Sequence, residues 1–167
     1  MRVVIVPSTL ALLPEYASIE DPIPELRTAV RAAVAWLLED GRARVHAGSP
    51  SAQRIGAHLL GDRVRDDAPN LLVVSNGSAT RTEKAPGHLD ERAAAFDSAI
   101  GKALADGDLA AIGDIDTALA EELWAMPDAA VLRTLPGLVP SVTSAQVDYD
   151  DAPYGVQYWV VRWQCAS

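Results

Sequence analysis

The chain has 167 residues, a length that fits one domain with one hydrophobic core. Hydrophobic residues make up 49% and charged residues 22% of the sequence, which excludes an intrinsically disordered chain. The formal net charge is -9; residues 85–167 hold thirteen acidic and four basic side chains, whereas residues 1–84 hold ten of each. Because an acidic surface repels phosphate backbones, we expect no nucleic-acid partner.

The cysteine content and the first residues exclude further classes of protein. A single cysteine, Cys165, allows no internal disulfide and no cysteine-based zinc site. The apolar run at residues 3–6 meets Pro7 at once, so it is too short for a signal-peptide core or a membrane span. We therefore expect a cytoplasmic protein without a membrane partner.

The first half of the chain alternates short apolar runs with helical periodicity. Residues 3–6 suit a strand that is buried on both faces, and residues 8–21 suit a loop. Asp21-Pro22 is typical of a helix start, and Asp40-Gly41 ends that helix. The elements that follow are expected to be a strand at 42–46, a short helix capped by Ser51 and stopped by Gly61, and a strand at 71–74.

The second half is first helical and then β-rich. The expected elements are a helix from Asp90 to Asp106, helical pieces at 115–124 and 129–135, and strands at 142–149 and 156–163 around a turn. The last two strands form a closing β-hairpin. In the last strand Tyr158 and Val160 point to one face and Trp159, Val161 and Trp163 to the other. Since both faces are apolar, this strand is expected inside the sheet.

This order of elements predicts an α/β fold: a single domain, mostly parallel sheet with helices on both faces and a C-terminal antiparallel β-hairpin. Ligands of such sheets bind outside the carboxyl ends of the strands. Here those ends are residues 7–9, 46–48 and 75–78. A functional site is therefore expected at this edge.

The most distinctive polar stretch, residues 75–84, follows a buried strand. Its hydroxyls and backbone N–H groups suit an anion or a substrate oxygen. The alternative is a strand-to-loop turn whose side chains cap their own backbone. The candidate ligand-binding residues at the expected edge are Ser8, Thr9, Asn76, Ser78, Arg81, Glu83 and Lys84.

The histidines carry no metal motif. His46, His58 and His88 show none of the spacings, such as H-x-x-x-H, by which histidines converge on a metal. His46, at a strand end, and His88, before a helix, are the candidate metal ligands. No nucleophile elbow, P-loop or G-x-G-x-x-G turn is present.

Two segments resemble a known family. The first, residues 71–90, reads LLVVSNGSATRTEKAPGHLD, and the second, residues 149–156, reads YDDAPYGV. Both resemble a small actinobacterial-type, subunit-B-like group of the class III (LigB-type) extradiol ring-cleavage dioxygenase superfamily. The resemblance runs from about residue 70 to residue 164 and implies one LigB-like domain over residues 1–167 with a shortened N-terminal part.

Catalytic members of that family hold Fe(II) with two histidines and a glutamate, and a further histidine acts as acid and base. Where the family has a Pro-His-x-Pro stretch, this chain has Ser8 after Pro7. Where the acid/base histidine is expected, Ala79 follows Gly77-Ser78. His46 is the nearest candidate by position for the second metal histidine. The resemblance therefore implies a degenerate site with no cofactor expected, and Fe(II) only if the family site is rebuilt.

Three functional hypotheses follow. The leading one is an extradiol dioxygenase-like protein without iron-dependent ring cleavage that binds a small polar ligand at the sheet edge. The second is a metal-dependent (Fe, Mn or Zn) enzyme with a rearranged site that uses His46, His88 and Glu83. The third is a non-catalytic interaction subunit or homo-oligomer that uses the acidic second half or the aromatic tail at Tyr158, Trp159 and Trp163.

Overall fold

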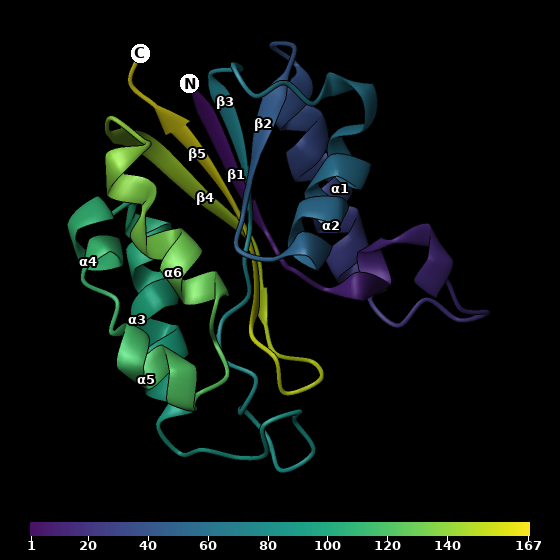
Figure 1. Cartoon of the computed structure of the whole chain (residues 1–167), viewed down its shortest axis with the longest axis vertical. Helices are drawn as coiled ribbons and strands as arrows, with labels where there is room; N and C mark the ends of the chain where they lie inside the picture. Colours follow the sequence, from purple (N-terminus) through teal and green to yellow (C-terminus); the bar gives the residue numbers. More distant parts are fainter.

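The computed structural model, which describes residues 1–167, has a five-stranded mixed sheet with helices on both faces (Figure 1). The strands are β1 (Arg2–Val6), β2 (Ala43–Ala47), β3 (Asn70–Val74), β4 (Val142–Asp151) and β5 (Tyr158–Cys165). The α-helices are α1 (Pro24–Leu38), α2 (Pro50–Leu60), α3 (Ala93–Asp106), α4 (Leu109–Gly113), α5 (Thr117–Glu122) and α6 (Asp128–Arg133). Short 3-10 turns are η1 (Leu10–Leu12), η2 (Pro14–Tyr16), η3 (Gly61–Arg63) and η4 (Leu135–Gly137). The predicted α/β fold class is confirmed.

The strand order β2-β3-β1-β5-β4 places the C-terminal hairpin beside the first strand. β2, β3 and β1 run parallel, whereas β5 pairs antiparallel with both β1 and β4. β5 therefore lies inside the sheet, as predicted. Every residue of β3 is buried, which fits a parallel strand that helices cover on both faces.

Two hydrophobic clusters join the helices to the two faces of the sheet. One joins α1 and α2 to one face and the other joins α3 to α6 to the opposite face (Figure 1). β5 contributes Tyr158 and Val160 to the first cluster and Trp159, Val161 and Trp163 to the second. The three aromatic side chains of this strand are at most 6% exposed. The hypothesis that they form an interface is wrong, because they are part of the core.

The segment after β1 is more ordered than the predicted loop, since η1 and η2 lie within it. The next helix begins at Pro24, two residues later than expected. Asp21 does not cap it: its carboxylate accepts hydrogen bonds from the backbone N–H of Ile23 (3.0 Å) and the side chain of Arg27 (2.8 Å). Asp21 instead ties the loop to the first turn of α1.

The later helices differ from the prediction at their ends. The hydroxyl of Ser49, not that of Ser51, caps α2 by accepting the N–H of Ala52 at 3.2 Å. The helix expected from Asp90 begins at Ala93. The piece expected at 115–124 is the shorter α5, and α4 was not predicted. Short helices of this kind have too few turns to show a clear period in the sequence.

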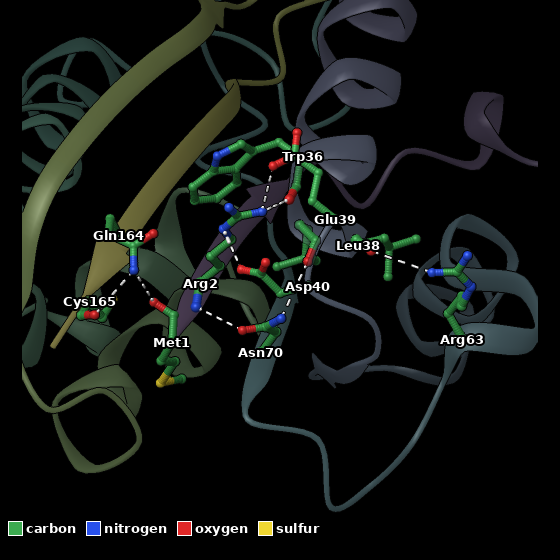
Figure 2. Close-up of polar contacts among 11 residues, drawn as sticks. Met1, Arg2, Trp36, Leu38, Glu39, Asp40, Arg63, Asn70, Gln164 and Cys165 are labelled. Atoms are coloured by element: carbon green, nitrogen blue, oxygen red, sulfur yellow. Dashed lines mark hydrogen bonds and ion pairs between the residues drawn. The ribbon is translucent and has the colours of Figure 1, made fainter. Parts of the chain in front are cut away.

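Polar contacts close the amino end of the sheet (Figure 2). Arg2, at the start of β1, forms ion pairs with Glu39 (2.9 Å) and Asp40 (3.1 Å) and lies 4.7 Å from the centre of the Trp36 ring. The backbone N–H of Arg2 donates to the side-chain oxygen of Asn70 at 2.9 Å. These partners satisfy most of the polar groups at this end, and Arg2 Nε, which makes no hydrogen bond, is held only by the ion pair with Asp40.

The carboxyl end of the parallel strands faces the loop after β3 and the turn of the β4–β5 hairpin (Figure 1). Three backbone hydrogen bonds of 2.9–3.0 Å join the two segments: Gly77 to Gln157, Gln157 to Ser78, and Arg81 to Gly155. None of the helices has the length and apolar character that a membrane-spanning helix requires.

Candidate functional site

A buried carboxylate, that of Asp128, organises the ends of β1 and β3. Asp128 begins α6 and is 7% exposed. Its Oδ2 accepts the hydroxyl of Ser8 at 2.5 Å and the backbone N–H of Asn76 at 2.8 Å. The side-chain oxygen of Asn76 in turn accepts the backbone N–H of Ser8 at 2.8 Å. Ser8 and Asn76 are therefore brought together, and they bind each other and Asp128.

Burial raises the pKa of Asp128, and the hydrogen bonds from Ser8 and Asn76 oppose this shift. The hydroxyl of Ser75 also donates to the backbone carbonyl of Asp128, at 3.2 Å. The polar groups of Ser8 and Asn76 were expected to face a ligand. In the structure they are instead hydrogen-bonded to each other and to Asp128. Nothing in the sequence pointed to Asp128, because an acidic residue after a proline is typical of an ordinary helix start.

A second buried carboxylate, Asp97, lies under the loop after β3. It is 2% exposed and accepts both the backbone N–H (2.8 Å) and the hydroxyl (2.6 Å) of Ser78. The guanidinium of Arg81 lies 3.6 Å from Asp97 Oδ2. Burial raises the pKa of Asp97, and Ser78 and Arg81 oppose this shift.

Asp97 had a signal in the sequence. It stands four residues after Ala93 and three before Ile100, on the apolar stripe of α3. A charged residue on a core-facing stripe needs a buried partner, and here Ser78 and Arg81 are its partners. Gly77 allows this approach, because a Cβ there would lie 2.6 Å from Asp97 Oδ1.

A hydrogen-bonded chain continues from Arg81 to the hairpin. Arg81 donates to the side-chain oxygen of Gln157 at 2.6 Å, and Gln157 donates through its amide nitrogen to Asp150 at 2.7 Å. These side chains enclose a hollow of about 160 Å³, which we name the Arg81 pocket. Its lining residues are Arg81, Asp97, Ser98, Asp150, Asp151, Ala152 and Gln157.

The remaining candidate residues lie elsewhere. Thr9 lies directly before η1, and its side chain makes no capping hydrogen bond. Glu83 and Lys84 are exposed and line a separate, open hollow with Tyr154. Of the seven predicted ligand-binding residues, the structure joins Ser8 to Asn76 and Ser78 to Arg81, the latter pair through Asp97. It does not bring all seven to one site.

The histidines do not converge. His46 Nε2 lies 2.8 Å from the hydroxyl of Thr134, and this hydroxyl also donates to the carbonyl of Val131. Burial lowers the pKa of His46. His88 lies in the exposed loop, with Nδ1 3.3 Å from the carbonyl of Glu83. No group of three or more His, Cys, Asp or Glu side chains is arranged to hold a metal ion.

Cys165 is the remaining side chain with nucleophilic chemistry. It is buried at the end of β5, and burial raises its pKa to about 11. A thiol with so high a pKa carries almost no thiolate near neutral pH and is a poor nucleophile.

No protein-family model and no curated protein matches this chain. The fold and the side chains described above are therefore the grounds for a functional proposal.

Proposed function

We propose that this chain is a ligand-binding domain on a scaffold that resembles the LigB-type extradiol dioxygenases, and that it does not carry out iron-dependent ring cleavage. The observation that supports this proposal is the contact between Ser8 and Asp128. Ser8 stands where the resemblance expects a metal histidine, and its hydroxyl is bound to a buried carboxylate. Serine is a poor Fe(II) ligand, because Fe(II) in such enzymes takes two histidines and one carboxylate.

The other expected positions also do not fit the iron. Ala79, at the place of the acid/base histidine, has no group that exchanges a proton. His46, His88 and Glu83 do not form one ligand group. We therefore assign ligand binding rather than ring cleavage to the carboxyl end of the parallel strands.

We propose that the ligand binds in the Arg81 pocket, at the carboxyl end of the parallel strands. Three of its charged side chains are aspartates and one is an arginine, and Arg81 is already bound to Gln157 and Asp97. A lining that is rich in carboxylates favours a compact cation with hydrogen-bond donors, such as a small amine.

A titration with ethanolamine, followed by two-dimensional ¹H–¹⁵N NMR, tests this assignment. We expect saturable shifts at the amides of Arg81, Ser98 and Gln157. Asp150→Asn, which removes one carboxylate of the lining, should weaken binding by roughly tenfold. Asp66→Asn is the matched control, because Asp66 is exposed in the turn before β3 and forms no hydrogen bond or ion pair. No saturable shift, or equal losses in both variants, would contradict the assignment.

An interaction role is a second candidate function, favoured by an exposed apolar group at the end of α5. Trp124 is 60% exposed, and Met126 and Leu89 nearby are 39% and 51% exposed. Trp124 also has a positive φ of 57°, a conformation that is uncommon for a bulky residue. Light scattering of the purified protein tests self-association: a dimer that Trp124→Ser dissociates would support this role, and a monomer at all concentrations would remove the homo-oligomer.

A further inference from the structure

A larger cavity lies beside the segment that follows β1 and shares no residue with the Arg81 pocket. The turns η1 and η2, together with α1 and α2, line an open hollow of about 420 Å³. Sites for small molecules commonly measure about 300–1,000 Å³. We name this space the Arg31 cavity, after the side chain on which the argument depends.

The wall of the Arg31 cavity is held in place at three points. Arg27 of α1 binds Asp21 (2.8 Å) and the carbonyl of Ala11 (2.8 Å). Glu15 of η2 forms an ion pair with Arg54 of α2. At the far end of the segment, the hydroxyl of Tyr154 donates to the carbonyl of Pro22 at 2.5 Å. The segment is therefore shaped before a ligand arrives, which lowers the entropic cost of binding.

Some charged side chains of the Arg31 cavity are paired with each other, and others have no hydrogen-bonded partner. Arg27 and Asp21 neutralise each other in a two-point contact of 2.8 and 3.2 Å. Arg31, one helical turn later on α1, lines the cavity without a hydrogen bond or ion pair, and so does His58 of α2. The exposed guanidinium of Arg31 and the exposed imidazole of His58 therefore border the cavity without a hydrogen-bonded protein partner, although the chain carries a net charge of -9.

Part of the cavity lining is apolar. Leu12 and Leu13 are anchored in the core at 4% exposure each, and Ala11, Pro14 and Ala17 complete this side. A guanidinium and an apolar surface in one cavity suit a ligand that combines one anionic group with a small hydrocarbon body. The guanidinium binds such a group through charge-assisted, often bidentate hydrogen bonds.

We propose that the Arg31 cavity binds a compact organic anion, with Arg31 and His58 donating to its carboxylate or phosphate group and the Leu12–Ala17 wall covering its apolar part. This site is independent of the Arg81 pocket, whose carboxylates favour the opposite charge.

The test is a calorimetric and NMR titration of the full chain with propionate and, separately, with inorganic phosphate, at constant ionic strength. We expect saturable binding of at least one anion, with shifts at the amides of Ala17, Ser18 and Arg31. Propionate binding alone would indicate a carboxylate ligand with an apolar body, and phosphate binding alone would indicate a phosphorylated one.

Three variants complete the test. Arg31→Gln should weaken binding by about tenfold or more, the order expected for the loss of one charge-assisted contact. Arg31→Lys should retain part of the affinity. Arg42→Gln removes the same charge from an exposed residue just before β2, at the other end of the sheet, and should bind as the native chain does. Absence of saturable binding to both anions, or an equal effect of Arg31→Gln and Arg42→Gln, would overturn the proposal.

Discussion

At the residue scale, two buried aspartates organise the carboxyl edge of the sheet. Asp128 and Asp97 each bind a serine hydroxyl and a backbone N–H, and both have a pKa that burial raises. A carboxylate in such a place is stable only while its partners remain. These hydrogen bonds hold the ends of β1 and β3 in place, and Asp97 itself lines the Arg81 pocket.

The raised pKa of Asp97 predicts a change of stability with pH. Because the folded state holds the proton to higher pH than the unfolded state, the contribution of this group is fully present below the unfolded pKa of about 3.9 and is lost as pH rises through the folded pKa. Asp97→Asn removes this loss. The free energy of unfolding of the variant minus that of the native chain should therefore increase from about pH 4 to about pH 7.

Urea denaturation at a series of pH values measures this difference, and Asp128→Asn should change it in the same direction. A difference that decreases with pH would mean that Ser78 and Arg81 stabilise the ionised form of Asp97 more than burial destabilises it.

At the element scale, the loop after β3 depends on a glycine. A Cβ at Gly77 would lie 2.6 Å from Asp97 Oδ1 and 2.7 Å from both Gln157 Cβ and the Trp159 ring. Gly77→Ala should therefore cost about 1–3 kcal/mol of stability, as overpacking of a buried site does. Gly137→Ala is the matched control, since no atom lies within 4 Å of the added carbon, and it should change stability by less than about 0.5 kcal/mol. Chemical denaturation of both variants decides; equal effects would contradict the close packing at Gly77.

The elements themselves were largely predictable from the sequence. All five strands were placed within two residues, because apolar and β-branched runs between turn residues have few other interpretations. The helix caps were less predictable, since Asp21 and Ser51 have the right chemistry for a cap. In the structure Asp21 binds Arg27 instead, and Ser49, two residues before Ser51, caps α2.

The site was predicted only in part. The polar residues after β1 and β3 were found because they follow buried strands. Their partners Asp97, Asp128 and Gln157 come from distant parts of the chain, and sequence spacing does not show which distant residues meet. The Arg31 cavity was missed for the same reason, because Arg31 and His58 lie on different helices.

At the scale of the whole molecule, β5 joins the two hydrophobic clusters. It separates β1 from β4 and places side chains on both faces of the sheet. A chain that ends at Pro140 lacks the hairpin, exposes the edge of β1 and uncovers both clusters. We expect this truncated chain to be unfolded by circular dichroism and NMR. Removal of Ala166 and Ser167 alone, which lie outside β5, should leave the fold intact; a folded truncated chain would contradict this role of the hairpin.

We propose that this scaffold does not hold catalytic iron, because the hydroxyl of Ser8, at the expected place of a metal histidine, is bound to the carboxylate of Asp128. The most direct measurement is the iron content of tag-free protein after anaerobic incubation with Fe(II) and removal of unbound metal, determined by mass spectrometry. We predict that iron stays far below one atom per chain and that His46→Ala does not change it. A stable content near one Fe(II) per chain that His46→Ala abolishes would contradict the account and indicate a metal-dependent enzyme.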